Sequence, residues 1–540
     1  MNHLSVNDYI VFCIYFIIVS GYGYWVYQRK KSVDKNVKDF FLAEGSLTWW
    51  AIGASIIASN ISAEHFIGMS GSGFAMGLAI ASYEWIAAAT LIIVAIFFLP
   101  VYVKNKIYTM PQFLANRYNG TVSSIMTVFW LLTYVLVNLT SIFFLGASAI
   151  ETISGVSFNT CIIGLAVFAL FITLGGMKVI GYTDVVQVFI LIAGGLVTCY
   201  LAMSLVSDKL HGTGVLDAFS ILRTHADDHF HMIFTKDNKF YDELPGISLL
   251  AGGMWVNNLN YWGCNQYIVQ RALGANINTG RNGLLFAAFL KLLIPVIVVI
   301  PGIAAYVLYQ QGFFQQEMAD AAGHIKPDHA YPVLMNLLPS GLKGLAFAAL
   351  TAAIVASLAG KSNSIATIFT LDIYKKYINK NASERKMVII GRWAVIISSL
   401  IAIIIAPALR TFDQIYQFIQ EYVGFISPGV LAIFLLGLFW KRTTSTAALV
   451  AALITIPLSI ILKFLPQLTA GMVEPIPFLN RMMWVFVITM AVMVGITLTA
   501  PKGENSMVKV NSQMFRLSTP FAVSSVIICG ILAALYIVFW

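Results

Sequence analysis

The sequence predicts an all-α integral membrane protein with about fourteen transmembrane helices. Composition is the first indication, because 59% of the 540 residues are hydrophobic and 11% are charged, whereas a soluble chain carries about 25% charged residues. Apolar runs of about 20 residues recur along the whole chain, and each is long enough to cross a bilayer as a helix. Two of these runs are interrupted by polar residues and glycines, which indicates protein-lined cavities at membrane depth.

The predicted helices follow one another through short connections, except at the long segment 207–246. Their expected ranges are 7–27, 47–73, 78–103, 122–151, 158–176, 183–206, 247–268, 282–309, 336–374, 387–408, 411–440, 444–464, 478–500 and 518–539. The first run does not have the order of a cleavable signal peptide, because the basic cluster Arg29–Lys31 follows the apolar residues instead of preceding them. We therefore expect it to span the membrane.

Lysines and arginines concentrate in alternate connections, which is the pattern of cytoplasmic segments. The segments concerned are 28–46, 104–121, 177–182, 269–281, 375–386, 441–443 and 501–517. With an even number of spans, both termini are expected outside. The net charge of +9 is explained by these connections, so it does not indicate a nucleic-acid partner. The expected environment is therefore a lipid bilayer.

The second and seventh predicted spans are interrupted in the same way, by "SNISAEHFIGMSGSG" at 59–73 and by "NNLNYWGCNQ" at 257–266. They lie five spans apart. Broken helices in corresponding positions of two halves are typical of inverted-repeat transporters, with the binding site between the halves. The expected organisation is an extra helix and basic linker at 1–46, a first repeat at 47–206, an outer loop at 207–246, a second repeat at 247–440 and three extra helices at 441–540.

Ionisable side chains inside spans are costly and usually functional. The candidates are Glu64, His65, Glu84, Asp184, Lys291, Lys361 and Glu421. For Asp184, Lys361 and Glu421, an alternative interpretation is a buried ion pair or a side chain that reaches the aqueous boundary. Glu84 lies among apolar and aromatic neighbours, which favours a functional role.

The sequence carries no constellation of catalytic residues. It has no GxxxxGKS/T phosphate loop, no HExxH motif and no GxSxG nucleophile in a strand–turn–helix context. Its five cysteines have no paired spacing, and its eight histidines form no convincing metal site. We therefore expect neither an enzyme nor a cofactor.

A small polar face in the ninth span is a candidate cation site. Ala353 and Ser357 are four residues apart, so they share one face of the helix. Hydroxyl oxygens and carbonyls freed at a helix break are the hard ligands that sodium sites in such transporters use. The alternative is helix–helix packing, for which small residues are also favoured.

Several stretches together resemble one family. They include "GASIIASNISAEHFIGMSGSG" at 53–73, "NYWGCNQYIVQR" at 260–271, "ATIFTLDIYKKY" at 366–377 and "FIQEYVGFISPG" at 418–429. The chain resembles the sodium/solute symporter family, in particular its sodium/glucose branch and the bacterial sodium/galactose symporters. The resemblance implies a leucine-transporter-type five-plus-five inverted repeat with extra terminal helices and alternating access. It also implies sodium-driven import of a neutral hexose across a bacterial inner membrane, with sodium as the coupling ion, by a monomer or weak homodimer.

The resemblance also assigns roles to matching positions. Sugar contacts would come from Asn60, His65, Glu84, Asn258, Lys291 and Gln420, with Tyr261 stacking on the ring as the inner gate. The outer gate would be Met69, Tyr83 and Tyr416. Sodium would bind the backbone carbonyls of Ala58, Ile61 and Ala353 and the hydroxyl of Ser357, with Asp184 near its exit path.

Some positions depart from the pattern of the bacterial galactose symporters. His65 stands in place of glutamine and Ala87 in place of serine, while Tyr416 replaces phenylalanine. The first two replacements resemble the animal sodium/glucose cotransporters, which favours glucose or a broader hexose pocket.

The expected ion site departs from the pattern as well. Ala356 removes one of two adjacent hydroxyls, and Ala359 and Gly360 stand where relatives with a second sodium carry hydroxyls. We therefore expect one coupled sodium. We also hypothesise that the charge of Lys361 substitutes for the missing cation, paired with Asp184; the alternative is that Lys361 reaches the cytoplasmic side.

Two alternative functions remain open at the level of sequence. The first is the same fold transporting another solute, such as myo-inositol, a nucleoside or sialic acid. The second is a uniporter or sensor that no longer couples sodium, which the missing hydroxyl at Ala356 would allow.

Overall fold

The computed structural model of the chain describes residues 4–29, 47–173, 177–319, 323–411, 415–500 and 508–540. Helices make up the regular structure of these residues, apart from one isolated bridge between Ala319 and Ile325. The prediction of an all-α protein is therefore confirmed. The basic linker expected after the first helix lies outside the described residues, except at its first positions.

Every predicted span coincides with helical structure. The first half contains α1 (Val6–Arg29), α3 (Trp49–Asn60), α4 (Ser70–Met76), α5 (Ser82–Ile93), α9 (Thr140–Ser154), α10 (Phe158–Thr173) and α11 (Met177–Lys209). The second half contains α14 (Gly253–Gly263), α15 (Gln266–Leu273), α16 (Ile277–Gln310), α18 (Leu342–Ile368), α19 (Glu384–Ile405), α20 (Ile415–Gly424) and α21 (Ser427–Phe439). The chain ends with α22 (Ser445–Lys463), α24 (Phe478–Thr499) and α25 (Thr519–Val538).

Ten helices of the described residues are long and apolar enough to cross a membrane, or up to eleven if α20 and α21, bent by 49°, form one span. This number differs from about fourteen because the seventh predicted span consists of two short helices and α10 has only 16 residues. In addition, one continuous helical stretch, Glu64–Lys104, contains the third predicted span and the last part of the second. The exact number of spans and the side of the termini stay predictions.

Gly77 explains how the chain passes from the second predicted span to the third within that helical stretch. Its φ of 72° is a left-handed conformation that side chains other than glycine rarely adopt. A Cβ atom there would also meet the backbone oxygen of His229 at 2.3 Å. The chain can therefore turn between α4 and α5, and the loop that carries His229 packs directly on this turn.

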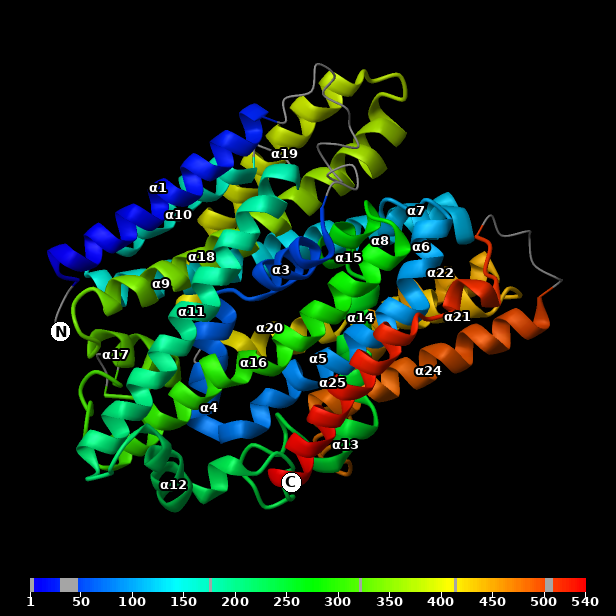
Figure 1. Ribbon diagram of the computed structural model, residues 1–540. Helices are drawn as coiled ribbons and strands as arrows, with labels where there is room; N and C mark the ends of the chain where they lie inside the picture. Colours follow the sequence, from blue (N-terminus) through cyan, green and yellow to red (C-terminus); the bar gives the residue numbers. More distant parts are fainter. Residues whose placement is uncertain (1–3, 30–46, 174–176, 320–322, 412–414, 501–507) are drawn as a thin grey trace.

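The broken spans lie in the middle of the molecule (Figure 1), where α3 packs against α16, α11 and α18 and α14 packs against α5 and α21. The extra helices lie at the edges: α1 packs on α18 at one edge, while α24 and α25 run along the other. This arrangement places residues of both predicted repeats around a common centre.

Hydrogen bonds near the ends of the helices hold the two ends of the bundle together. At one end, Asp8 accepts hydrogen bonds from the N–H groups of Gly341 and Gly344, at 2.7 and 2.8 Å. The C-terminal residues meet the segment 207–246, where the N–H of Met232 donates to the oxygen of Phe539 at 2.8 Å. At the other end, the Arg281 guanidinium donates to the oxygen of Met514 at 2.7 Å.

Candidate functional site

A polar cavity of about 90 Å³ lies where the two broken spans meet. Its lining residues include Asn60, Glu64, His65, Tyr83, Glu84, Asn258, Tyr261, Lys361, Tyr416 and Gln420. Six of the seven predicted sugar contacts therefore face one cavity, although they come from positions up to 360 residues apart. Lys291, the seventh, does not line the cavity and acts behind it, as described below.

The first break follows directly from the backbone of "SNIS". Helix α3 ends at Asn60, and Ile61 adopts an extended conformation with φ −75° and ψ 122°. The N–H of Ser62 points toward His65 Nδ1 at 3.4 Å, and the N–H of Glu64 donates to Ser62 Oγ at 3.1 Å. Because Ser62 no longer continues the helical pattern, the carbonyl of Ala58 loses the donor that a regular helix would provide.

The second break is stabilised by a side chain from another helix. Helix α14 ends at Gly263, and Asn265 is extended, with φ −99° and ψ 122°. The hydroxyl of Tyr134 accepts the N–H of Gln266 at 3.1 Å and contacts the side-chain oxygen of Asn265. Both interruptions expected from the sequence are thus present at the centre of the molecule, each with freed backbone groups.

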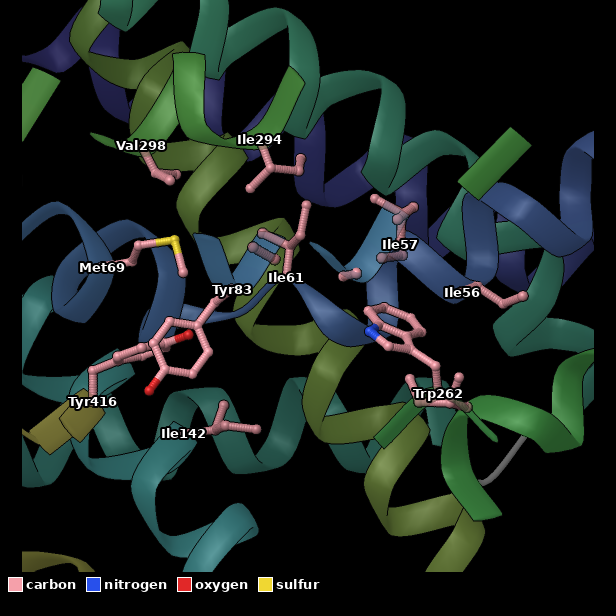
Figure 2. Packing of buried hydrophobic residues seen from close by; sticks show 14 of the residues in the cluster. Ile56, Ile57, Ile61, Met69, Tyr83, Ile142, Trp262, Ile294, Val298 and Tyr416 are labelled. Atoms are coloured by element: carbon pink, nitrogen blue, oxygen red, sulfur yellow. The ribbon is translucent and has the colours of Figure 1, made fainter. Parts of the chain in front are cut away.

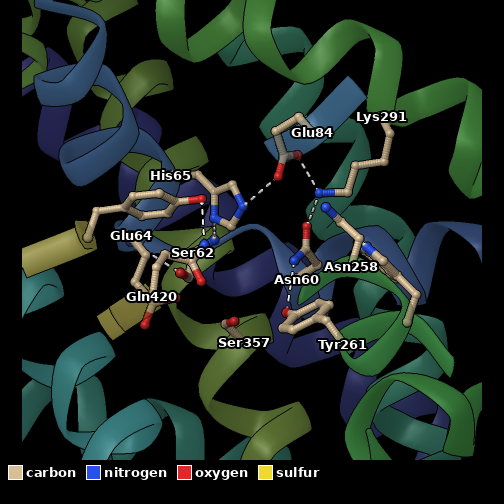
Figure 3. A network of polar contacts seen from close by, with 12 residues as sticks. Asn60, Ser62, Glu64, His65, Glu84, Asn258, Tyr261, Lys291, Ser357 and Gln420 are labelled. Carbon is tan, nitrogen blue, oxygen red and sulfur yellow. Dashed lines mark hydrogen bonds and ion pairs between the residues drawn. The ribbon is translucent and has the colours of Figure 1, made fainter. Parts of the chain in front are cut away.

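Glu84 and Lys291 form an ion pair beside the first break, which we call the closed pair (Figure 3). The Lys291 ammonium donates to both the Glu84 carboxylate and the side-chain oxygen of Asn60. The other oxygen of Glu84 lies 3.4 Å from His65 Nε2. Lys291 is completely buried, so it holds Glu84 and Asn60 in place from behind the cavity wall.

Tyr261 connects this network to the second break. The amide of Asn60 donates to the Tyr261 hydroxyl at 2.9 Å. The ring of Tyr261 packs edge-on against Trp262 and Tyr267, with centroid distances of 5.0 and 5.7 Å. Lys291 Nζ lies 5.0 Å from the Trp262 ring centroid, within the range of a cation–π contact.

A second pair of opposite charges, Glu64 with Lys361, lines the same cavity, and we call it the open pair. Glu64 Oε1 accepts the hydroxyl of Ser141 at 2.6 Å, and Glu64 Oε2 lies 4.0 Å from Lys361 Nζ. Lys361 Nζ also lies 5.3 Å from the ring centroid of Tyr267. The side chain of Lys361 is 4% exposed, so it does not reach the cytoplasmic boundary.

The hypothesis that Lys361 pairs with Asp184 is wrong. Asp184 is fully buried, accepts the hydroxyl of Ser55 and lies 3.7 Å from the Arg271 guanidinium. Arg271 in turn donates to the backbone oxygen of Ser55 at 3.0 Å. The interpretation of Asp184 as a member of a buried ion pair is confirmed, with Arg271 as its partner.

The connection expected at 269–281 begins later than predicted, because helix α15 extends to Leu273 and carries Arg271. Helix α15 continues the chain for eight residues after the second break, and this extension carries Arg271 into the interior at 2% exposure. A Cβ atom at Gly360 would meet Arg271 Nη2 at 2.5 Å and Ser59 Oγ at 2.9 Å. The absence of a side chain at Gly360 therefore gives this guanidinium its space beside the first break.

The amide groups of two predicted sugar contacts, Asn258 and Gln420, already form hydrogen bonds within the protein. Asn258 accepts the indole N–H of Trp262 at 3.1 Å and donates to the oxygen of Met254 at 3.1 Å. Gln420 donates to the hydroxyl of Tyr416 at 2.9 Å. Each side chain still lines the cavity, with hydrogen-bonding capacity left over.

The three predicted outer-gate residues lie close together (Figure 2), and two of them, Tyr83 and Tyr416, line the cavity. The rings of Tyr83 and Tyr416 meet at 88° with centroids 5.7 Å apart, and His65 lies 6.4 Å from Tyr416. Met69 is completely buried and does not line the cavity itself. The arrangement is a closed aromatic contact between α5 and α20.

The predicted sodium ligands lie at the contact of α3 with α18. The hydroxyl of Ser357 donates to the backbone oxygen of Ser59 at 2.6 Å, which holds α18 against the break. Ala58, Ile61 and Ala353 are completely buried in the same region. The freed carbonyl of Ala58 and the hydroxyl of Ser357 are hard oxygen donors of the type that fits a sodium ion.

Glu421 is an ion-pair residue away from the cavity, as its alternative interpretation proposed. Its carboxylate contacts the Arg481 guanidinium and lies 3.1 Å from Lys463 Nζ. Sequence reasoning did not predict Ser141, Tyr134 or Tyr267 at the site. Their signal was weak, because a lone hydroxyl within an apolar span is also common in helix packing.

Comparison with known proteins identifies the family. The profile of the sodium:solute symporter family matches residues 40–455. The chain belongs to the sodium:solute symporter family. It is 47% identical over 551 residues to a sodium/glucose cotransporter of Vibrio parahaemolyticus, covering 99% of both chains. It is 33% identical over 462 residues to sodium/myo-inositol cotransporter 2 of Mus musculus, covering 82% of this chain and 67% of that protein.

Solved structures support the fold. A Na+-coupled sialic acid symporter in a substrate-bound outward-open state has a TM-score of 0.77 at 21% identity, covering 93% of this chain and 99% of that chain. The nucleobase-cation-symport-1 family transporter Mhp1 in a closed conformation has a TM-score of 0.52 at 13% identity, covering 88% and 98%. The leucine-transporter-type fold and a transporter rather than an enzyme, both expected from the sequence, are confirmed.

Proposed function

We propose that this symporter imports a neutral hexose together with one sodium ion. The observation that carries the proposal is the polar cavity at the break, where side chains of Asn60, His65, Glu84, Asn258 and Gln420 offer paired donors and acceptors. The charge of Glu84 is balanced by Lys291, so the wall suits a neutral polyol more than an ion. A site of this kind discriminates strongly against solutes that leave a buried polar group unpaired.

Sodium binding would act on the first break. An ion held by the carbonyls of Ala58, Ile61 and Ala353 and the hydroxyl of Ser357 would fix α3 against α18 in the form that accepts sugar from outside. Sodium then raises the affinity for sugar by shifting an existing equilibrium, and linkage requires the reverse effect to be equal. After the change to the inward form, sodium leaves past Asp184, and the sugar follows as Tyr261 moves.

One sodium per sugar is supported by the residues around Ser357. Ala356 supplies no hydroxyl, and the space beside Gly360 is taken by the guanidinium of Arg271. Two cationic side chains, Arg271 and Lys361, are already buried near the break. Their partners Asp184 and Glu64 are thereby engaged, so these carboxylates are not free to bind a second sodium ion.

Myo-inositol is the alternative solute that one observation favours. It is also a neutral ring with several hydroxyls, and the mouse relative carries sodium/myo-inositol in its name. Sialic acid fits less well, because Lys291 already donates to Glu84 and Asn60, and a solute carboxylate near Lys361 would be repelled by Glu64. A uniporter or sensor would keep the cavity and lose the sodium response.

The decisive experiment is uptake of labelled hexose into proteoliposomes with and without an inward sodium gradient. Accumulation above equilibrium that requires the gradient supports sodium-coupled import. Uptake that ignores the gradient would favour the uniporter, and no uptake of any hexose would overturn the proposed substrate class. Potassium replaces sodium in the control.

The identity of the sugar is best approached through His65. We expect competition by glucose, galactose, mannose and inositol to differ between wild type and His65→Gln, because His65 lines the cavity and contacts Glu84 at 3.4 Å. An unchanged order of competitors would show that His65 does not determine specificity. Arg481→Gln, outside the cavity, is the control.

A further inference from the structure

The open pair is a polar feature of the cavity that the proposed function leaves unused. Lys361 Nζ lies 4.0 Å from Glu64 Oε2, which is too long for a hydrogen bond. Among the described residues, the ammonium lies near this carboxylate and near the face of the Tyr267 ring. It makes no hydrogen bond to either of them. A buried ammonium with three unused donors is costly unless something in the cavity accepts them.

Glu64 is held so that its free oxygen faces the same gap. The hydroxyl of Ser141 donates to Oε1 at 2.6 Å and fixes the carboxylate from the side of α9. Oε2 remains directed to Lys361 and both side chains line the cavity. The pair therefore presents a fixed acceptor and a fixed cluster of donors next to each other.

A separation of 4.0 Å is suited to one bridging oxygen. A hydroxyl group placed about 2.8 Å from each atom would accept from the ammonium and donate to the carboxylate. The closed pair has no such space, because Lys291 contacts Glu84 directly. Among chemical classes, only a group that is both donor and acceptor satisfies both members of the open pair.

We propose that Glu64 and Lys361 bind one hydroxyl of the transported solute, in a subsite beside Tyr267. This inference rests on the proposed import of a neutral polyol. Tyr267 packs on Tyr261 at 5.7 Å, so the subsite adjoins the residue expected to stack on the sugar ring. A carboxylate on the solute would satisfy Lys361 but would be repelled by Glu64, so a neutral polyol is the class that fits.

The test combines a variant with a series of analogues. Uptake of labelled hexose is inhibited by the parent hexose and by monodeoxy-hexoses, each lacking a different hydroxyl, in wild type and in Lys361→Met. The parent should inhibit the variant about tenfold more weakly than wild type, as expected for losing a hydrogen bond to a charged group. The analogue that lacks the bound hydroxyl should already inhibit wild type weakly. Its inhibition should weaken by less than about twofold in the variant, because the hydrogen bond to Lys361 is absent in both proteins.

If inhibition weakened equally for the parent hexose and all analogues, the inference would be overturned, because Lys361 would then act through folding or sodium binding. Lys463→Met is the matched control, since it removes an ammonium from a lysine–glutamate pair outside the cavity and Glu421 keeps Arg481. Its analogue profile should equal that of wild type. Failure of wild type itself to take up hexose would instead contradict the proposed function.

Glu64→Gln keeps the test decisive if Lys361→Met does not fold. Glutamine retains an acceptor for Ser141 and removes the charge that faces Lys361. It should weaken the parent hexose and spare the same single analogue. Inhibition that weakens equally for all analogues would overturn the inference in this variant as well. So would a change only in the sodium concentration required for half-maximal uptake.

Discussion

Two carboxylate–ammonium pairs flank Tyr261, and they differ in how completely they are satisfied. Lys291 lies over Trp262 and contacts Glu84 and Asn60 directly, whereas Lys361 lies over Tyr267 and stays 4.0 Å from Glu64. Trp262 and Tyr267 both pack edge-on against Tyr261. The chemical components are thus the same on both sides of this residue, but the distances are not.

The difference separates a structural use of buried charge from a binding use. Lys291 is completely buried and donates to both Glu84 and Asn60, so it fixes the orientation of these two side chains. Lys361 faces the cavity with its donors free, so it retains capacity for a ligand. An ion pair inside a membrane protein can therefore shape a site or belong to its contact surface, and the distance between the charges distinguishes the two cases.

The largest effect is expected at the closed pair. Lys291→Met leaves Glu84 buried without its main partner, which costs about 3–5 kcal/mol of folding free energy. We expect loss of folded protein, measured by size-exclusion chromatography in detergent. Lys291→Met combined with Glu84→Gln should recover folded protein but not uptake. A double variant as unstable as the single one would contradict the assignment of a mainly electrostatic cause.

The ion site should respond next, and separately from both pairs. Ser357→Ala removes the hydroxyl that contacts the break of α3. The sodium concentration for half-maximal uptake should rise about tenfold, since a charged ligand bond of about 1.5–3 kcal/mol is lost. The hexose concentration for half-maximal uptake, measured at saturating sodium, should change little. An unchanged sodium requirement would remove Ser357 from the coupling site.

Tyr261 and Tyr267, whose rings pack against each other, allow a matched comparison with a smaller expected effect. Tyr261→Phe loses the hydrogen bond from Asn60, so the hexose concentration for half-maximal uptake should rise about threefold to tenfold. Tyr267→Phe removes a buried hydroxyl that has no hydrogen-bond partner among the described residues, so uptake should be nearly unchanged. Equal effects of the two substitutions would show that the Asn60 contact is not important.

The smallest effect is expected for an ion pair at the periphery. Lys463 and Glu421 lie 3.1 Å apart but each side chain is 27% exposed. Partly exposed pairs contribute about 0–1 kcal/mol. Lys463→Met should therefore leave uptake unchanged. It should shift the melting temperature by no more than a few degrees, measured by a thermofluor assay in detergent. A strong loss of transport would show that the pair controls the gate helix α20.

Hydropathy and turn residues predicted much of the fold. Apolar runs predicted the helices, and asparagine and glycine at residues 59–73 and 257–266 predicted both interruptions. Family resemblance predicted which side chains would meet at the cavity. The partners of buried charges were not predictable, because pairing depends on contacts between distant helices. Lys361 was assigned to Asp184, whereas the packing of α18 against α9 and the first break gives it Glu64.

Arg271 shows a second limit of sequence reasoning. An arginine shortly after an apolar run indicates a cytoplasmic boundary, but the helix that follows the second break stays inside the protein. A single sequence does not distinguish these cases, because both have a basic residue one or two turns after a polar interruption. The space next to Gly360 is the feature that admits the guanidinium, and it appears only in three dimensions.

The ratio of sodium to hexose that enters proteoliposomes tests the central claim most directly. Charge movement, measured at a controlled membrane potential, is compared with uptake of labelled hexose by the same vesicles. We expect one positive charge per sugar, supplied by the single sodium bound near Ser357. Two charges per sugar would contradict the single ion site, and sugar entry without charge movement would contradict coupling itself.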